Sequence, residues 1–412
     1  MVKYTLCLSG GGFRASLFHA GLVRRLIYLD LFKHIHRINS ISGGSITAGL
    51  IMKELTVKSF SDVDDFDQRV IVPLIKFIQS SPRKKIYKIN PLNNNPHKFS
   101  KYVDQQLFNG LAFSDLCKFP AWHCYATSLN SAMSWKFSQT EIGDSATGFS
   151  QPSHIDKVAD GIVASACFPP LFKPFKFNTE GRSFVLKWVN GQLLNVPNSS
   201  PPSSIFLTDG GVYDNLGSES VITKKADFIV SDASGVVDHW GNTKPNKFFM
   251  MKRTIDVSMD QNGKLRRRLL FNSLNANSVL VELAKPLDTY TKKVVPDKDS
   301  PTPPEQMPIY PEIHRDFQKA IGTIRTDLNA FHDFEIHTLI WNGMVKIDAA
   351  MKRWCPHLIK EQHWNDVPNL NSIDFPTAAE VLNKGSKTNI WGKQHQELHS
   401  EKKLVDNISN IL

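Results

Sequence analysis

The stretch "SISGGSITAG", Ser40–Gly49, places two adjacent glycines between serines and continues in small residues. Before it, Arg37–Ile41 has the pattern of a short strand, and "ITAGLIMKEL" after it is compatible with a helix. The stretch therefore predicts a strand, a sharp glycine turn and a helix. A serine on such a turn is raised above the sheet edge, with a helix N-terminus beneath it. Ser42 and Ser45 are both candidate nucleophiles, and the alternative is a serine that only caps the helix.

The same order of elements occurs earlier in the chain. Tyr4–Leu8 has the pattern of a buried strand, and "SGGGFRAS", Ser9–Ser16, follows it. The next segment, "LFHAGLVRRLIYLDLF", repeats apolar residues near helical spacing, at Phe18, Leu22, Leu26 and Leu29. Two units of strand, glycine turn and helix within about 55 residues indicate an α/β fold with a parallel sheet.

The first glycine turn, Gly10–Gly12, can present backbone N–H groups to an anion at a helix N-terminus. That anion is either a bound phosphate or the oxyanion of an acyl-transfer intermediate. Arg14 beside the turn either stabilises negative charge or braces the loop. The stretch is neither a Walker loop nor a GxGxxG fingerprint. Taken alone, a plain tight turn is the more ordinary interpretation.

A third turn is "TDGGVYDNLG", Thr208–Gly217, directly after the predicted strand "SIFL". Asp209 ends that strand, and Gly210 and Gly211 make the turn. Active sites of open α/β sheets lie at the carboxyl ends of strands, where a carboxylate can act as a general base. The alternative is an aspartate that only hydrogen-bonds its own turn. Together, the three turns supply an oxyanion hole, a nucleophile and a base, which are the parts of a serine hydrolase.

With these motifs the sequence resembles the patatin-like phospholipase family, in its bacterial form. The family's oxyanion loop is matched by Gly10-Gly11-Gly12-Phe13-Arg14, its elbow by Gly43-Gly44-Ser45 and its aspartate turn by Asp209-Gly210-Gly211. A fourth block, alanine and serine followed by prolines, is matched by Ala164–Pro170. Two residues depart from the pattern. Thr47 replaces the second glycine of the elbow, and Ala15 replaces the glycine that usually follows the arginine.

The resemblance implies a three-layer α/β/α fold with a mostly parallel central sheet, and a mainly helical C-terminal region. It also implies a serine acyl hydrolase with a Ser–Asp dyad, acting on fatty-acyl esters of phospholipids or lysophospholipids. Ser45 would attack the ester and form an acyl-enzyme, and Asp209 would take its proton. The Gly10–Gly12 amides, aided by Arg14, would hold the oxyanion. The resemblance implies no metal and no cofactor.

Two alternatives for the catalytic residues remain open at this stage. Ser42 fits the related cytosolic phospholipases, whose serine precedes a glycine, but we favour Ser45 because an elbow serine opens the helix. A histidine triad is the second alternative. The candidate histidines follow Asp209 in the chain: His239, His314, His332, His337, His357 and His363. None of them has a glycine-rich or strand-end context, and the resemblance favours the dyad.

The domain prediction places a catalytic domain at residues 1–250 and a mainly helical extension, packed on it, at residues 251–412. Residues 56–118 are polar, basic and rich in turns, so we interpret them as an insertion that can form a lid. Residues 292–311 hold several prolines and are interpreted as a loop. The segment "IWGKQHQELHSEKKLVDNIS" is interpreted as a terminal helix.

The cysteine content and the apolar segments indicate the cellular compartment of the protein. Five scattered cysteines without a CxxC pair argue against a disulfide framework and a zinc site, which favours a cytoplasmic protein. The N-terminus does not read as a signal peptide, and no run of 18 apolar residues predicts a transmembrane helix. We therefore expect any membrane contact to be peripheral, at the inner face.

The net charge of +10 is compatible with an anionic partner, either nucleic acid or anionic lipid, while general solubility is the more ordinary interpretation of so modest an excess. Two basic stretches with interleaved apolar residues, Pro82–Lys88 and Lys264–Leu270, are candidates for contact with an anionic membrane. The apolar residues that would enter the lipid are Ile86, Tyr87, Leu265, Leu269 and Leu270, and the alternative for each stretch is a solvated helix face. The rival functions are a phosphate- or nucleic-acid-binding protein and a catalytically silent scaffold. We expect no nucleic acid, because both stretches lack the aromatic pattern that stacks single strands. Oligomeric state is not predicted.

Overall fold

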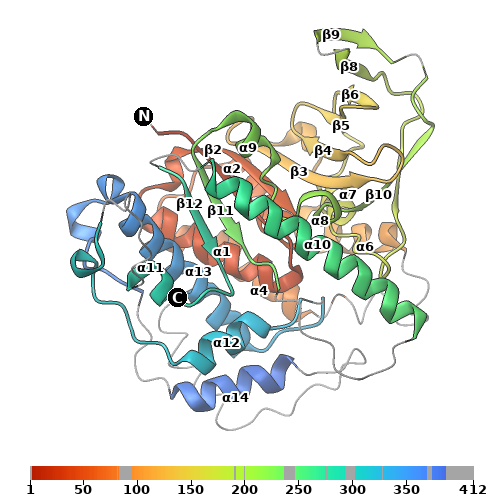
Figure 1. Cartoon of the computed structure of the whole chain (residues 1–412). Helices are drawn as coiled ribbons and strands as arrows, with labels where there is room; N and C mark the ends of the chain where they lie inside the picture. The colour runs from red at the N-terminus through yellow and green to blue at the C-terminus, as the bar shows by residue number, and fades with distance from the viewer. Residues whose placement is uncertain are drawn as a thin grey trace.

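The computed structural model describes residues 2–80, 82, 95–189, 192–198, 200–235, 246–273, 277–292, 302–326, 328–368 and 374–386. Three sequence predictions fall outside these ranges: the basic stretch Pro82–Lys88 after its first residue, His239, and the terminal helix at residues 390–409. Figure 1 shows a twisted sheet crossed by long helices.

Five parallel strands form the centre of the sheet, in the order β12-β11-β1-β2-β3. Their bounds are β1 Tyr4–Leu8, β2 Ile35–Ile41, β3 Ala121–Ser128, β11 Phe228–Asp232 and β12 Val279–Glu282. The residues of β1 and β11 are buried throughout, as expected for parallel strands covered on both faces. The prediction of an α/β fold with a parallel central sheet is confirmed.

Antiparallel strands extend this centre beyond β3, and this antiparallel pairing was not predicted from the sequence. The edge continues as β4-β5-β6-β8-β9, while β10 pairs with the end of β3 and with β7. Their bounds are β4 Ser134–Ser138, β5 Ile142–Asp144, β6 Gly148–Ser150, β7 Phe175–Asn178, β8 Val185–Val189, β9 Gln192–Pro197 and β10 Ser204–Asp209. The pairing of β10 with β3 brings Asp209 beside Ala126, near the end of β2.

Helices cover both faces of the sheet, which makes the fold three-layered. α1 (Gly12–Tyr28), α2 (Gly43–Val57) and α13 (Asp333–Trp354) pack in the large core that also receives Leu6 and Leu8 of β1. On the opposite face Cys7 of β1 lies in a second apolar cluster with Val221 and Leu270. These two residues belong to α9 (Glu219–Lys224) and α10 (Lys247–Phe271), and α10 crosses in front of the sheet in Figure 1.

The remaining helices complete the two layers. They are α3 Val63–Phe66, α4 Val72–Gln79, α6 Pro96–Val103, α7 Val158–Ser165, α8 Gly211–Asp214, α11 Asp288–Thr291, α12 Arg315–Thr323 and α14 Phe375–Ser386, with two π-helical segments, Asp67–Ile71 and Asp104–Phe108. Short 3-10 turns lie at Phe32–His34, Phe113–Asp115, Pro304–Gln306, Pro356–Leu358 and Glu361–His363. No helix in the described ranges has the length and apolar character to cross a membrane.

The two regions proposed from the sequence share one core. Two elements C-terminal to residue 250 take part in this core: β12 pairs with β11 in the sheet, and α13 packs against α1. In the described part of residues 56–118, Phe66, Phe77 and Phe99 are buried in the same large core. These segments therefore help to build the fold, and a domain division at residue 250 and a lid role for residues 56–118 stay predictions.

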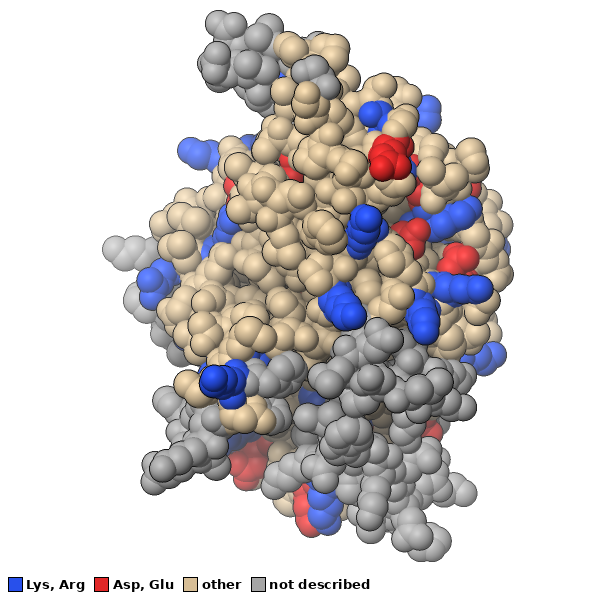
Figure 2. Space-filling view, turned by 90° about the vertical axis from the view of Figure 1, so that its right-hand side faces the viewer, with Lys and Arg blue, Asp and Glu red and all other residues tan. Residues whose placement is uncertain are grey.

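Basic residues outnumber acidic ones in the chain, 49 to 39, which gives the net charge of +10. Figure 2 shows the side of the molecule that lies to the right in Figure 1, where Lys and Arg side chains spread over the described surface with fewer Asp and Glu among them.

The crossing of α1 and α13 is close enough to require glycine. A Cβ added to Gly21 would lie 1.9 Å from the carbonyl oxygen of Ile340. We expect Gly21→Ala to lower the free energy of unfolding by about 2 kcal/mol or more, because the backbones must separate within a packed core. Urea unfolding measures this loss. Gly263→Ala is the control, since a Cβ there meets only Arg267 at 3.7 Å and alanine should stabilise the helix by up to about 1 kcal/mol. Equal effects of the two changes would contradict this account of the crossing.

Candidate active site

The turn between β2 and α2 is made at Ser42. β2 ends at Ile41 and α2 begins at Gly43, and Ser42 between them has φ 50° and ψ −118°. Few residues with a side chain adopt a positive φ, and such strain collects at active sites. A Cβ on the next residue, Gly43, would lie 2.0 Å from the carbonyl oxygen of Gly12, so the turn is pressed against the first glycine loop. In serine hydrolases of α/β fold, a strained turn from strand to helix of this kind can carry a nucleophile.

Asp209 faces this elbow from the end of β10. The Ser42 hydroxyl hydrogen-bonds the Asp209 carboxylate, and the backbone N–H of Gly211 donates to the same carboxylate at 2.8 Å. Asp209 is only 2% exposed, and this burial raises its pKa to about 6, although both hydrogen bonds act to lower it. A carboxylate with a pKa near neutrality can accept a proton from a serine more readily than an ordinary aspartate.

Ser45 lies one helical turn beyond the elbow. It is fully buried, and its hydroxyl lies 3.0 Å from that of Ser40 and 3.1 Å from that of Ser165. The expectation that Ser45 would open the helix is therefore wrong, because the chain turns three residues earlier and brings Ser42 to Asp209. With the turn at Ser42, Gly44 takes the place of the second elbow glycine. Thr47 lies further along α2, where its hydroxyl donates to the carbonyl oxygen of Ser16 at 2.8 Å.

The glycine loop Gly10–Gly12 joins β1 to α1 beside Ser42. A Cβ on Gly10 would lie 3.2 Å from the Cβ of Ser42, which places the loop at the serine. The N–H of Gly10 is already used, because it donates to the carbonyl oxygen of Asn215 at 3.1 Å. Gly11 and Gly12 have positive φ values of 141° and 59° and begin the first turn of α1, where N–H groups lack helical acceptors. Within the described ranges we find no protein acceptor for these two N–H groups.

The contacts of Arg14 point away from a role in binding an oxyanion. Its guanidinium donates to the carbonyl oxygen of Ala233 at 2.7 Å and to that of Ile324 at 2.8 Å, and the side chain is buried. Of the two roles considered from the sequence, the contacts favour bracing of the loop over direct stabilisation of an oxyanion. Ala15, the departure next to it, is buried and donates its N–H to Gly11.

We expect Arg14→Ala to lower the free energy of unfolding by about 3 kcal/mol, because two buried carbonyl groups lose their donor. Urea unfolding tests this, with the exposed Arg268→Ala as a control that should change stability by less than about 0.5 kcal/mol. A variant that stays fully stable but loses activity would instead favour an arginine that contacts the oxyanion.

Ser165 and Asn215, which were not among the predicted site residues, hold the elbow and the glycine loop in position. The hydroxyl of Ser165 accepts the N–H of Ser42 at 2.8 Å and donates to the carbonyl oxygen of Tyr125 at 2.6 Å. The backbone of Asn215 holds Gly10, as described above. A signal for both was present, because Ser165 lies in the block Ala164–Pro170 and Asn215 lies in Thr208–Gly217.

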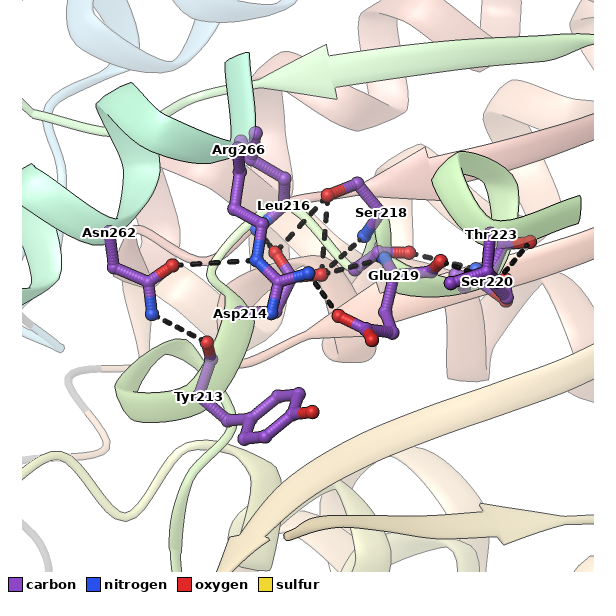
Figure 3. A network of polar contacts seen from close by, with 11 residues as sticks. Tyr213, Asp214, Leu216, Ser218, Glu219, Ser220, Thr223, Asn262 and Arg266 are labelled. Atoms are coloured by element: carbon purple, nitrogen blue, oxygen red, sulfur yellow. Dashed lines mark hydrogen bonds and ion pairs between the residues drawn. The ribbon is translucent and has the colours of Figure 1, made fainter. Parts of the chain in front are cut away.

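The segment after Asp209 is fixed by its own network, shown in Figure 3. The carboxylate of Asp214 accepts the N–H groups of Leu216, Ser218 and Glu219, at distances of 2.7 to 3.0 Å. From α10, the side chain of Asn262 donates to the carbonyl oxygen of Tyr213 at 2.7 Å, and Arg266 pairs with Glu219. α10 is thus tied directly to the aspartate turn.

No histidine hydrogen-bonds Ser42 or Asp209 in the part of the chain that the structure describes. His314 accepts from Asp316, His357 lies 3.0 Å from Asn277, and His363 lies 3.2 Å from Gln362. The arrangement of the described residues therefore contains a serine and a carboxylate in direct contact, without an intervening imidazole.

Comparison with known proteins adds a family to this geometry. A family model described as Patatin-like phospholipase matches residues 6–222, which is more than half of the chain and includes all three turns. No curated protein matches the chain. Human GIVD cytosolic phospholipase A2, in complex with methyl gamma-linolenyl fluorophosphonate inhibitor and terbium chloride, aligns with a TM-score of 0.44 at 10% identity. The alignment covers 93% of this chain and 60% of the human chain. VipD from Legionella pneumophila aligns with a TM-score of 0.30 at 11% identity, over 100% of this chain and 90% of that one.

Proposed function

Because the chain belongs to the patatin-like phospholipase family, we propose that it hydrolyses fatty-acyl esters of phospholipids or lysophospholipids through a dyad of Ser42 and Asp209. Ser42 replaces Ser45, which we favoured from the sequence. The observation that carries this proposal is the hydrogen bond between the Ser42 hydroxyl and the buried Asp209 carboxylate at a strained elbow.

In the first step Ser42 Oγ attacks the ester carbonyl carbon while Asp209 accepts the hydroxyl proton. The carbonyl oxygen becomes an oxyanion, and the N–H groups of Gly11 and Gly12 are the donors we assign to it. α1 and α2 both begin at this point, so the positive ends of their helix dipoles favour the developing negative charge. Collapse of the intermediate breaks the ester C–O bond, and the leaving alkoxide takes the proton from Asp209.

In the second step water attacks the acyl-enzyme, and Asp209 accepts a proton from that water. The new tetrahedral intermediate breaks the bond to Ser42 Oγ, which recovers its proton from Asp209. The products are a fatty acid and the deacylated lipid. We propose that the reaction takes place in the cytoplasm, at the inner face of a membrane.

The two rival functions have less support. A phosphate- or nucleic-acid-binding role would use the glycine loop but gives no reason for a strained serine in contact with a buried carboxylate. A catalytically silent scaffold keeps the same geometry, so only an activity measurement separates it from an enzyme.

The test is release of fatty acid from vesicles of phosphatidylcholine and from lysophosphatidylcholine, measured by mass spectrometry. Wild-type protein should release fatty acid from at least one of them, and Asp209→Asn should not. The position of the released chain defines the acyl specificity. Absence of release, together with absence of labelling by a fluorophosphonate, would favour the silent scaffold.

A further inference from the structure

The inner face of α10 is built against the candidate active site. The terminal methyl group of Met259 would lie 2.8 Å from a Cβ on Gly211, two residues after Asp209. Asn262 and Arg266 hold the following segment, and the amino group of Lys252 lies 5.6 Å from the ring centre of Phe168. Figure 3 shows Asn262 and Arg266 pointing from α10 toward Tyr213 and Glu219. A displacement of α10 would therefore be transmitted directly to the aspartate turn.

The outer face of the same helix carries large apolar side chains in the open. Met250, Val257 and Leu265 are 52%, 42% and 54% exposed. They are seven and eight residues apart, so they line one stripe that runs about 22 Å along the helix. Exposed apolar side chains gathered in one patch indicate an interaction site. Further exposed apolar side chains flank the stripe: Met251, Leu269 and Phe271. The prediction that Leu270 enters the lipid is wrong, because this side chain is fully buried in the second cluster.

The charge of α10 favours an anionic partner for this stripe. The helix contains seven Lys or Arg and only two Asp. Lys252, Arg266 and Arg267 of this helix form ion pairs with acidic side chains, so the charge beside the stripe comes from the other basic residues. Lys264, beside the stripe, is half exposed although it pairs with Asp260, and Arg268 is exposed on the same side. A helix with an apolar stripe and basic residues beside it has the composition of a helix that lies in a membrane interface. A second copy of the chain fits less well, because a symmetric pairing of two α10 stripes would bring like charges together.

We propose that the outer face of α10 docks on an anionic phospholipid bilayer, with Met250, Val257 and Leu265 in the acyl boundary and the basic residues at the head groups. The aspartate turn packs on the opposite side of the helix, so it would lie roughly 10 Å, one helix diameter, from the docked face. The purpose of this docking, to bring an ester within reach of Ser42, rests on the proposed function. The docking itself does not depend on catalysis.

Vesicle flotation in the Ser42→Ala background tests the proposal without turnover of the lipid. The probes are vesicles of phosphatidylcholine alone and of equal parts phosphatidylcholine and phosphatidylserine. We expect binding to the mixed vesicles, and a loss on the order of tenfold or more when α10 carries Met250→Ser, Val257→Ser and Leu265→Ser. The matched control changes three apolar residues of similar or greater exposure outside α10: Val57→Ser, Ile155→Ser and Ile309→Ser. The control should bind like the parent, and circular dichroism verifies that both variants fold.

Three outcomes would overturn the proposal: no binding of the parent to mixed vesicles, equal binding by the α10 variant, or equal loss in the control variant. Light scattering covers a further possibility, because a dimer that becomes a monomer in the α10 variant, without vesicle binding, would identify a second copy as the partner. A failure of the proposed catalytic function is recognised separately, since it would remove fatty-acid release from wild-type protein and leave vesicle binding intact.

Discussion

Ser42→Ala should abolish covalent labelling by a fluorophosphonate and lower kcat for ester hydrolysis by roughly 10³-fold or more. The variant lacks the hydroxyl that hydrogen-bonds the Asp209 carboxylate. Binding of lipid and the glycine loop remain, so the residual rate should come from these alone. Intact-protein mass spectrometry measures the labelling, and fatty-acid release measures kcat.

Ser45→Ala is the matched control for this experiment. Ser45 is fully buried and contacts Ser40 and Ser165, away from Asp209. Its loss should remove about 1 kcal/mol of stability, reduce kcat by less than about tenfold, and leave labelling intact. Loss of labelling in Ser45→Ala with labelling retained in Ser42→Ala would restore the assignment that the sequence alone favoured.

The two serines show where sequence reasoning was sufficient and where it was not. The strand at Tyr4–Leu8 and the helices after the first two glycine turns follow from local sequence patterns, so the order of these elements could be predicted. The residue that carries the turn could not be predicted in the same way, because both Ser42 and Ser45 adjoin the Gly43-Gly44 pair. The choice depends on Gly43 packing against Gly12, a contact between residues distant in the sequence.

Other differences have the same origin in tertiary contacts. Arg14 is next to the glycine loop in the sequence, yet its guanidinium is held by Ala233 and Ile324, more than 200 residues away. Apolar residues Leu265, Leu269 and Leu270 all suggested lipid contact, but only the packing against α9 decides that Leu270 is buried. By contrast Asp209 was found correctly at a strand end, because a strand followed by Asp-Gly-Gly is a local pattern.

Asp209→Asn should lower kcat by roughly 10⁴-fold, because the amide cannot accept the proton of Ser42. Wild-type kcat/KM should also depend on pH in a defined way. The carboxylate must be ionised to act as a base, and its pKa is raised to about 6 by burial. Activity should therefore be level above that pH and fall about tenfold per pH unit below it. A profile that stays level down to pH 4 would contradict the role of Asp209 as the base.

The same substitution should make the protein more stable at neutral pH. A raised pKa means that the folded state disfavours the ionised carboxylate relative to the unfolded chain, whose reference value is 3.8. Below that value both states are protonated and the penalty vanishes, and it grows as pH rises to about 6 and is then constant. Asp209→Asn removes this penalty, worth at most about 3 kcal/mol. The difference in Tm between variant and wild type should thus grow from pH 4 to pH 6 and level off above it. A stability difference without this pH dependence would show that the buried charge at Asp209 carries no strain, and that its basicity does not come from burial.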